Sequence, residues 1–118
     1  MPQYMLLIYA DPTQAPPPEE MQAELPKWFA YGEQMTSAGV MVGGDALHPT
    51  SAATTLRVRE GDRLVTDGPF AETKEQLGGY YLIDAKNVDE AIAIAGRIPS
   101  ARHGSIEVRP VAEMPKKS

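Results

Sequence analysis

The sequence contains few side chains that could exchange protons near neutral pH. Its 118 residues include two histidines, His48 and His103, and no cysteine. Histidine is the side chain best suited to taking up and releasing a proton near pH 7, and a carboxylate commonly orients it. We therefore treat both histidines as candidate acid–base groups. The alternatives are a turn role for His48, which precedes Pro49, and an exposed loop position for His103.

Two carboxylates stand in contexts where they could assist a histidine. Asp67 opens an Asp-Gly-Pro sequence, and Asp45 follows two consecutive glycines. Either residue could serve as an acid or a base in a cleft. Asp67 has a structural alternative, because an Asp in such a sequence commonly closes a turn. A small-molecule enzyme would pair Asp67 with His103 or His48.

Other polar residues could hold a ligand without reacting with it. Arg57 and Arg109 lie on expected strands, where a guanidinium group can clamp a carboxylate or phosphate, although surface ion pairing is the alternative. Glu72 and Lys74 could close over a ligand as a short lid, or could form a solvated loop. Tyr81 alternates with its neighbouring tyrosine, so one of the two should face the helices and the other a partner or cleft.

Several kinds of chemistry are excluded or unsupported by the sequence. Without cysteine there can be no disulfide, thiolate nucleophile or thiolate-bound metal. The two histidines lack a metal-binding spacing, and the chain has no phosphate-binding glycine loop, nucleophile elbow or dinucleotide fingerprint. We therefore expect no metal and no cofactor, which leaves cofactor-free chemistry or simple binding.

The charge and composition limit the partners. The formal net charge of -5 disfavours nucleic acid, because binding a phosphate backbone requires clustered lysine and arginine. No apolar run is long enough to span a membrane, and no secretory leader pattern is present, so we expect a cytoplasmic protein with no membrane partner. Lys116 and Lys117 are interpreted as a solvated tail.

Hydrophobic periodicity predicts one α+β domain over residues 1–118. An apolar run from Tyr4 predicts the first strand, and a helix follows from Glu19 to a cap at Gly39, with Pro26 either kinking it or starting it anew. A second helix should open at Asn87 and end before Pro99. The remaining predicted strands cover 40–43, 54–59, 63–66, 79–84 and 105–110, with a loop at 45–49 and a hairpin turn at 61–62.

This order fits a ferredoxin-like antiparallel sheet with both helices on one face. The strands at 4–9 and 79–84 carry apolar residues on both faces, whereas the two helices can cover only one. In the first helix the apolar stripe is expected at Met21, Leu25, Trp28 and Met35. The uncovered face of the sheet then requires a partner, most simply a second copy of the chain.

One long segment carries a family resemblance. The block DGPFAETKEQLGGYYLIDA begins at Asp67 as a turn, and Phe70 is expected to anchor the loop in the core. Together with the opening strand, the segment 42–47 before a proline and the terminal strand 105–110, this block resembles the DGPF-motif branch of the YCII-related family. The resemblance covers nearly the whole chain.

The resemblance implies a ferredoxin-like fold that pairs into a dimeric α/β barrel, with a cleft between helix and sheet or at the dimer seam. It also implies an association with extracytoplasmic-function sigma factors, which are often encoded nearby. Two functional hypotheses remain open. One is a small-molecule enzyme that uses Asp and His for acid–base chemistry. The other is a ligand-sensing or protein-interaction module with a sigma-factor-related regulatory partner.

Overall fold

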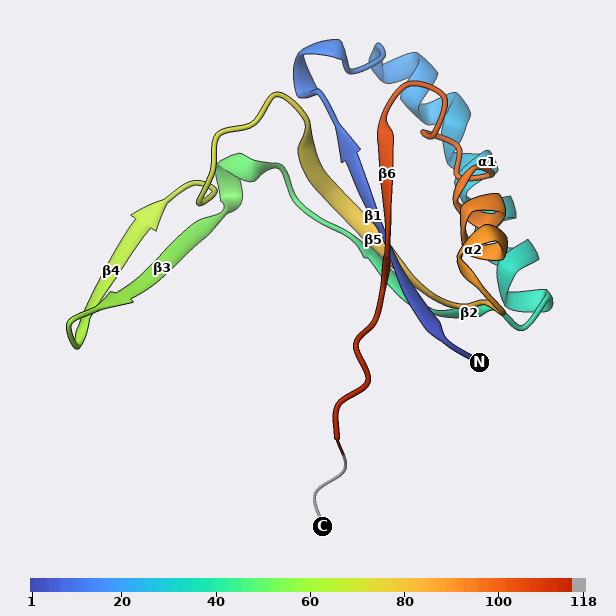
Figure 1. Cartoon of the computed structure of the whole chain (residues 1–118). Coiled ribbons are helices and arrows are strands. Elements are labelled where there is room, and N and C mark those ends of the chain that lie inside the picture. Colours follow the sequence, from blue (N-terminus) through green and yellow to red (C-terminus); the bar gives the residue numbers. More distant parts are fainter. Residues whose placement is uncertain (116–118) are drawn as a thin grey trace.

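The computed structural model describes residues 1–115, so the predicted tail at Lys116 and Lys117 lies outside the described residues. This part of the chain forms six strands and two α-helices (Figure 1). In chain order they are β1 (Gln3–Ala10), α1 (Pro18–Ser37), β2 (Met41–Ala46), β3 (Thr54–Arg59), β4 (Asp62–Asp67), β5 (Gln76–Asp84), α2 (Val88–Ala95) and β6 (Ser105–Pro110). Short 3-10 turns at Pro12–Gln14 and Thr50–Ala52 interrupt two of the connections.

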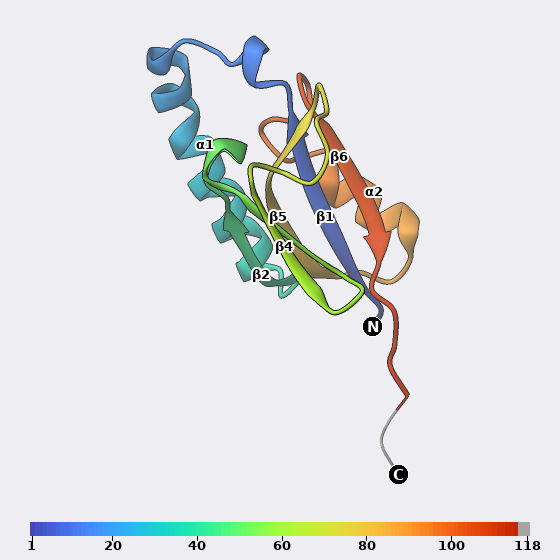
Figure 2. The ribbon, with the colours of Figure 1, turned by 90° about the vertical axis from the view of Figure 1, so that its left-hand side faces the viewer.

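Four strands form an antiparallel sheet in the order β2-β5-β1-β6. Both helices cover the same face of this sheet, which confirms the predicted α+β class (Figure 1). Strands β3 and β4 form a separate two-stranded hairpin. The hairpin stands on the side of the sheet away from the helices, as Figures 1 and 2 show from two directions.

The core lies between the sheet and the helices. Leu6 on β1 and Ile83 on β5 are fully buried and pack against both helices. Tyr81 also points to the helices, where its ring lies 5.4 Å from that of Tyr31 and 6.5 Å from that of Trp28. Further core side chains are Tyr4, Met35, Ala85, Ala91, Ile94, Ala95 and Ile98. Apolar burial of this kind is the main term that holds the helices on the sheet.

Helix α1 buries only the second half of the predicted stripe, where Trp28 and Met35 pack on the core. Tyr31 and Met35 are buried in its second half, whereas Met21 and Leu25 in its first half are 53% and 50% exposed. The expectation for Met21 and Leu25 was therefore wrong. The helix also continues through Pro26 rather than starting there. It begins at Pro18, where the missing N–H of proline costs no helical hydrogen bond.

The predicted capping residues form the C-terminal end of α1 and the N-terminal end of α2. Gly39 adopts φ 75° directly after α1, and the bonds from Gly39 N to Thr36 O and from Val40 N to Met35 O, each 3.0 Å, form a Schellman motif. The side chain of Asn87 accepts a hydrogen bond from the N–H of Glu90 at 3.0 Å, which confirms the predicted cap of α2.

Several element boundaries differ from the predictions; strand β5, for example, begins at Gln76 rather than at Gly79. Strand β2 extends through Asp45 and Ala46, which were expected in a loop, because both pair with β5. The β3–β4 turn is formed by Glu60 and Gly61, both with positive φ, one residue earlier than expected. Helix α2 ends at Ala95, well before Pro99.

The second face of the sheet carries no helix in the described structure. We call this surface the open face; it includes Met5, Leu7, Tyr9, Tyr80, Leu82, Glu107 and Arg109. None of the helices formed by residues 1–115 is long and apolar enough to cross a membrane.

Candidate functional site

Asp67 and Arg57 lie on the hairpin. Asp67 is the exposed last residue of β4, and the N–H of Gly68 beyond it donates to the carbonyl of Ala53 at 2.7 Å. Arg57 Nη2 donates to the carbonyl of Phe70 at 3.3 Å and so holds the following loop against β3. Phe70 itself is 78% exposed, so the expectation that it anchors the loop in the core was wrong. Neither Asp67 nor Arg57 lines either of the two cavities described below.

Asp45 lies near the end of β2 and His48 in the connection after it, and their surroundings differ. Asp45 Oδ2 accepts a hydrogen bond from the hydroxyl of Tyr80 at 2.8 Å, which places Asp45 on the open face. This bond raises the pKa of the Tyr80 hydroxyl, so the phenol stays protonated. His48 lies in the exposed connection after β2. Neither residue forms a hydrogen bond with Asp67 within residues 1–115.

Arg109 and Tyr81 lie on opposite faces of the sheet. Arg109 forms an ion pair with Glu107, which also accepts a hydrogen bond from the Tyr9 hydroxyl at 3.2 Å. The bond from Arg109 holds the pKa of Glu107 below its usual value. Tyr81 belongs to the core beside Trp28, where burial raises its pKa. These contacts give Arg109 an ion-pair partner and Tyr81 a packing role.

The structure does bring His103 and Lys74 together. They line a cavity of about 510 Å³ at one end of the sheet, which we call the His103 cavity. Its lining residues are Asp11, Gln14, Thr73, Lys74, Glu75 and His103. They come from the connection after β1, the loop before β5 and the loop before β6. Glu72, the other proposed lid residue, is exposed and outside this lining.

Close backbone contacts fix the loops around the cavity. A Cβ added at Gly104 would lie 2.5 Å from the carbonyl oxygen of Tyr9, so only glycine lets the loop of His103 approach the end of β1 this closely. The hydroxyl of Ser105 donates to the carboxylate of Glu75 at 2.9 and 3.0 Å. This bond ties the loop before β5 to the start of β6.

Asp11 contributes a fixed carboxylate to the cavity. Its Oδ1 accepts hydrogen bonds from the hydroxyl and the N–H of Thr13 at 2.7 and 2.9 Å. These two bonds hold the pKa of Asp11 below its usual value, and the nearby Lys74 acts in the same direction. The buried Oδ2 has no hydrogen-bond partner among residues 1–115. Asp11 therefore stays ionised, and one of its oxygens is a shielded acceptor without a partner in this part of the chain.

Glu24 on α1 is the carboxylate that contacts His103. Its Oε1 lies 3.4 Å from Nε2 of His103 and 3.4 Å from Nη2 of Arg102. The side chain of Glu24 is only 17% exposed, whereas that of His103 is 44% exposed. A shielded carboxylate beside a more accessible imidazole is the arrangement that orients a histidine for proton transfer.

Sequence reasoning missed both Glu24 and Asp11. Glu24 is separated from His103 by 79 residues and belongs to a charged stretch of α1 that gives no local signal. Asp11 was assigned only to the end of the first strand; the adjacent Pro12 and Thr13 form the Asp-capped turn that could have identified it as a fixed acceptor. Within the described residues, no group of three or more His, Asp or Glu side chains could hold a metal ion.

Comparison with known proteins shows the family of the chain. The family model of the YCII-related domain matches residues 2–115. An uncharacterised protein of Rhizobium meliloti is 43% identical over 113 residues, which cover 92% of this chain and 91% of that relative. The chain therefore belongs to the YCII-related family.

Proposed function

We propose that this YCII-related protein binds a small polar molecule in the His103 cavity and transfers a proton on it without a cofactor. The observation that carries the proposal is the contact between His103 and Glu24 at the wall of a cavity that also holds Lys74 and Asp11. His103 is the general acid–base residue in this proposal, and Glu24 is its positioning residue. The reaction class is an isomerisation, elimination or dehydration.

The roles follow from the charges around the cavity. His103 takes a proton from a carbon next to a carbonyl group, and the electron pair of that C–H bond moves onto the carbonyl oxygen. The ammonium group of Lys74 stabilises the resulting negative charge, since cations aimed at a developing oxyanion lower the barrier. The ionised carboxylate of Asp11 at the cavity wall accepts a hydrogen bond from a substrate hydroxyl and so fixes the orientation of the substrate.

The same protein is proposed to work as a homodimer with a ferredoxin-like subunit, as expected for a dimeric α/β barrel of the DGPF branch. The strand order β2-β5-β1-β6 with both helices on one face supports this arrangement. The chain is also unusually extended for one subunit. Its radius of gyration is 16.7 Å, whereas a compact domain of this length has about 13.5 Å.

The exposed area supports the second copy independently. The chain exposes 8772 Å², whereas a monomeric protein of its mass exposes about 6,300 Å². The excess exceeds the roughly 800 Å² per partner that a stable interface needs. The open face and the apolar hairpin residues Leu56, Val58 and Val65, each more than half exposed, are the surfaces that a second copy would cover.

Proton transfer can be tested before the substrate's full reaction is known. Small carbonyl compounds that raise the melting temperature of the protein would be incubated with it in D₂O, and exchange of their C–H protons would be followed by NMR. We expect the wild type to catalyse exchange, and His103→Gln to slow it by about 10² to 10⁴-fold, the usual contribution of a general base. Glu24→Gln should lower the rate while the compound still binds.

The alternative function is ligand sensing by the same cavity. Stabilisation by a compound without any exchange would overturn the enzymatic proposal and favour a module that responds to an effector and passes its occupancy to a sigma-factor-related partner. His48→Gln is the matched control, because His48 lies outside the His103 cavity. Equal losses in His48→Gln and His103→Gln would contradict the assigned role of His103.

A further inference from the structure

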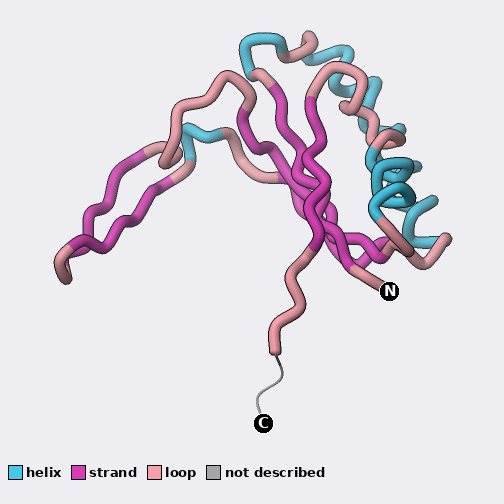
Figure 3. Tube along the Cα trace, viewed as in Figure 1, coloured by secondary structure: helices cyan, strands magenta, loops and turns pink. Residues whose placement is uncertain are grey.

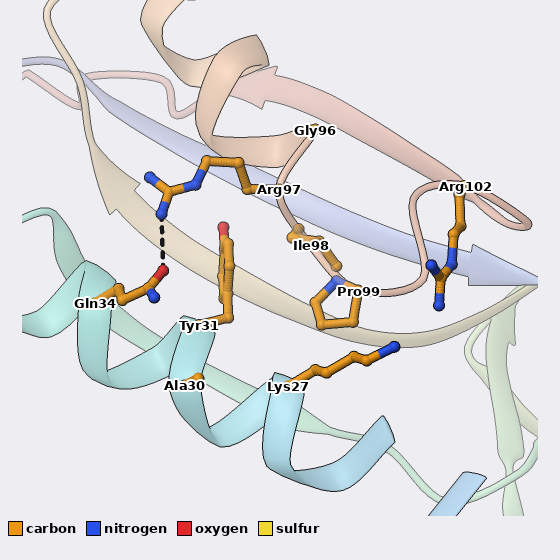
Figure 4. A pocket seen from close by; sticks show the side chains of 9 residues that line it. All are labelled: Lys27, Ala30, Tyr31, Gln34, Gly96, Arg97, Ile98, Pro99 and Arg102. Carbon is orange, nitrogen blue, oxygen red and sulfur yellow. Dashed lines mark hydrogen bonds between the residues drawn. The ribbon is translucent and has the colours of Figure 1, made fainter. Parts of the chain in front are cut away.

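A second cavity lies between α1 and the segment that follows α2. It has a volume of about 390 Å³. We call it the basic cavity, because the side chains around it include three cations (Figure 4). It is lined by Lys27, Ala30, Tyr31, Gln34, Gly96, Arg97, Ile98, Pro99 and Arg102. It shares no lining residue with the His103 cavity.

The charge around the basic cavity is opposite to that of the whole protein. Lys27, Arg97 and Arg102 line it, whereas no carboxylate among residues 1–115 does so, although the chain carries a formal net charge of -5. The side chains of Lys27 and Arg102 extend toward the same end of the cavity, and Arg97 lies at the other end (Figure 4). A local excess of positive charge of this kind attracts anions.

Arg97 is held in place by a neutral partner. Its Nη2 donates to Oε1 of Gln34 at 2.7 Å, so the guanidinium group is oriented without being neutralised. Arg97 is not needed to satisfy the end of α2. The carbonyl of Ile94 there already accepts from the Tyr31 hydroxyl at 3.0 Å, and that of Ala95 from the N–H of Ile98 at 3.1 Å. Its remaining donors are free for a ligand.

Arg102 retains most of its hydrogen-bonding capacity. It contacts Glu24 at 3.4 Å through one nitrogen, and its side chain is 65% exposed. A guanidinium group has five donors, so this single long contact leaves a planar set of donors for a carboxylate or a phosphate.

The rest of the cavity wall is apolar and rigid. Pro99 and the buried Ile98 form the side between the cations, and the small side chain of Ala30 leaves space above α1. Burial keeps the pKa of the Tyr31 hydroxyl above its usual value, and this hydroxyl is bonded to Ile94, so it adds no negative charge. Ligand sites combine such an apolar wall with a few convergent polar groups.

We propose that the basic cavity is a binding site for a small organic anion that bears a phosphate or carboxylate group on an apolar body. The charged group contacts Lys27 and Arg102 at one end of the cavity, the apolar body packs on Pro99, and Arg97 adds positive charge at the other end. A cavity of about 390 Å³ falls in the range of roughly 300–1,000 Å³ that small-molecule sites occupy. The proposal does not depend on chemistry at His103.

The test uses the full-length protein and simple probes. Phenyl phosphate and benzoate would be titrated separately and followed by backbone amide NMR, with phenol as the neutral control. We expect saturable shifts around Arg97 and Arg102 with either anion and none with phenol; the tighter of the two anions identifies the preferred charged group. Added salt should weaken binding, because the cations are exposed.

Two variants and one matched control decide the outcome. Arg102→Gln and Lys27→Gln should each weaken binding about 10-fold, as expected for losing one charge-assisted contact. Arg59→Gln removes an exposed arginine on the hairpin and should change the affinity less than about 2-fold. Because Lys27 is exposed on α1, its replacement should leave the fold intact, so a loss of affinity in Lys27→Gln reports on binding. Shifts that cluster at Lys74, unchanged affinity in both variants, or no saturable binding would overturn the proposal.

Discussion

The hydroxyl groups of Tyr31 and Tyr80 show how burial determines the contribution of a single hydrogen bond to stability. Tyr31 is 3% exposed and donates to a backbone carbonyl of α2, whereas Tyr80 donates to the exposed carboxylate of Asp45. We expect Tyr31→Phe to lower the free energy of unfolding by about 1 kcal/mol, the usual net value of a buried hydrogen bond. Tyr80→Phe should change it by less than about 0.5 kcal/mol. Urea denaturation would measure both variants, and a larger loss in Tyr80→Phe would contradict this ranking.

Tyr31 also predicts how stability depends on alkaline pH. Burial raises the pKa of its hydroxyl, so the folded protein keeps the proton at a pH where the unfolded chain, with a pKa of about 10, releases it. The stabilising contribution is thus complete below about pH 10 and decreases above it, by up to about 1.4 kcal/mol per pH unit. Unfolding curves between about pH 9 and pH 11 should show a shallower decrease for Tyr31→Phe than for the wild type. Equal slopes would show that Tyr31 is not the group responsible.

At the scale of elements, two glycines in and just after α1 show how backbone conformation decides the effect of a substitution on stability. Gly32 lies inside α1 and Gly39 follows its end, and an added Cβ would meet nothing within 4 Å at either position. Of these two glycines, only Gly39 has a positive φ. Gly32→Ala should therefore stabilise the protein by about 0.5–1 kcal/mol through helix propensity. Gly39→Ala should destabilise it by about 1 kcal/mol through backbone strain. Thermal unfolding of the two variants checks the opposite signs, and a shift of the same sign in both would refute the explanation.

Local sequence signals predicted the ends of the helices better than they predicted which residues of a helix pack on the sheet. The Asn87 cap and the Gly39 stop were both identified, because each is a local interaction that the residue types determine. The stripe of α1 was predicted from periodicity alone, which cannot tell how far the sheet extends along a helix. Tyr31 was missed, although it forms the centre of the interface with Tyr81.

The candidate site could be predicted only in part for a related reason. His103 and Lys74 were singled out from their residue types, and the structure places both at one cavity. Glu24 depends on how α1 lies beside the loop before β6, which no local pattern encodes. The position of the hairpin is equally non-local, so the sequence could not show that Asp67, at the end of β4, lies outside the lining of the His103 cavity. Figure 3 shows how far β3 and β4 stand from the other strands.

At the scale of the whole molecule, the open face predicts self-association. Leu82 on β5 lies opposite Met5 on β1, near the middle of this face. We expect sedimentation equilibrium to show a dimer for the wild type and mainly a monomer for Leu82→Glu, because a carboxylate buried in an apolar interface is costly. Met5→Glu should act in the same way.

The control for this prediction lies on the other side of the molecule. Phe29 on α1 is 67% exposed and points away from the sheet's open face, so Phe29→Glu should remain dimeric. Circular dichroism would verify that each variant keeps its helices. A wild-type chain that sediments as a stable monomer, or a Phe29→Glu variant that dissociates as readily as Leu82→Glu, would refute the proposed assembly.

Trp28 provides a built-in optical probe. It is the single tryptophan of the chain, and it stands between helix α1 and Tyr81 of the sheet. Tryptophan fluorescence therefore comes from one known position. While α1 stays packed on the sheet, excitation energy absorbed by the adjacent tyrosines can be transferred to Trp28. Loss of that transfer would time the detachment of the helix during unfolding.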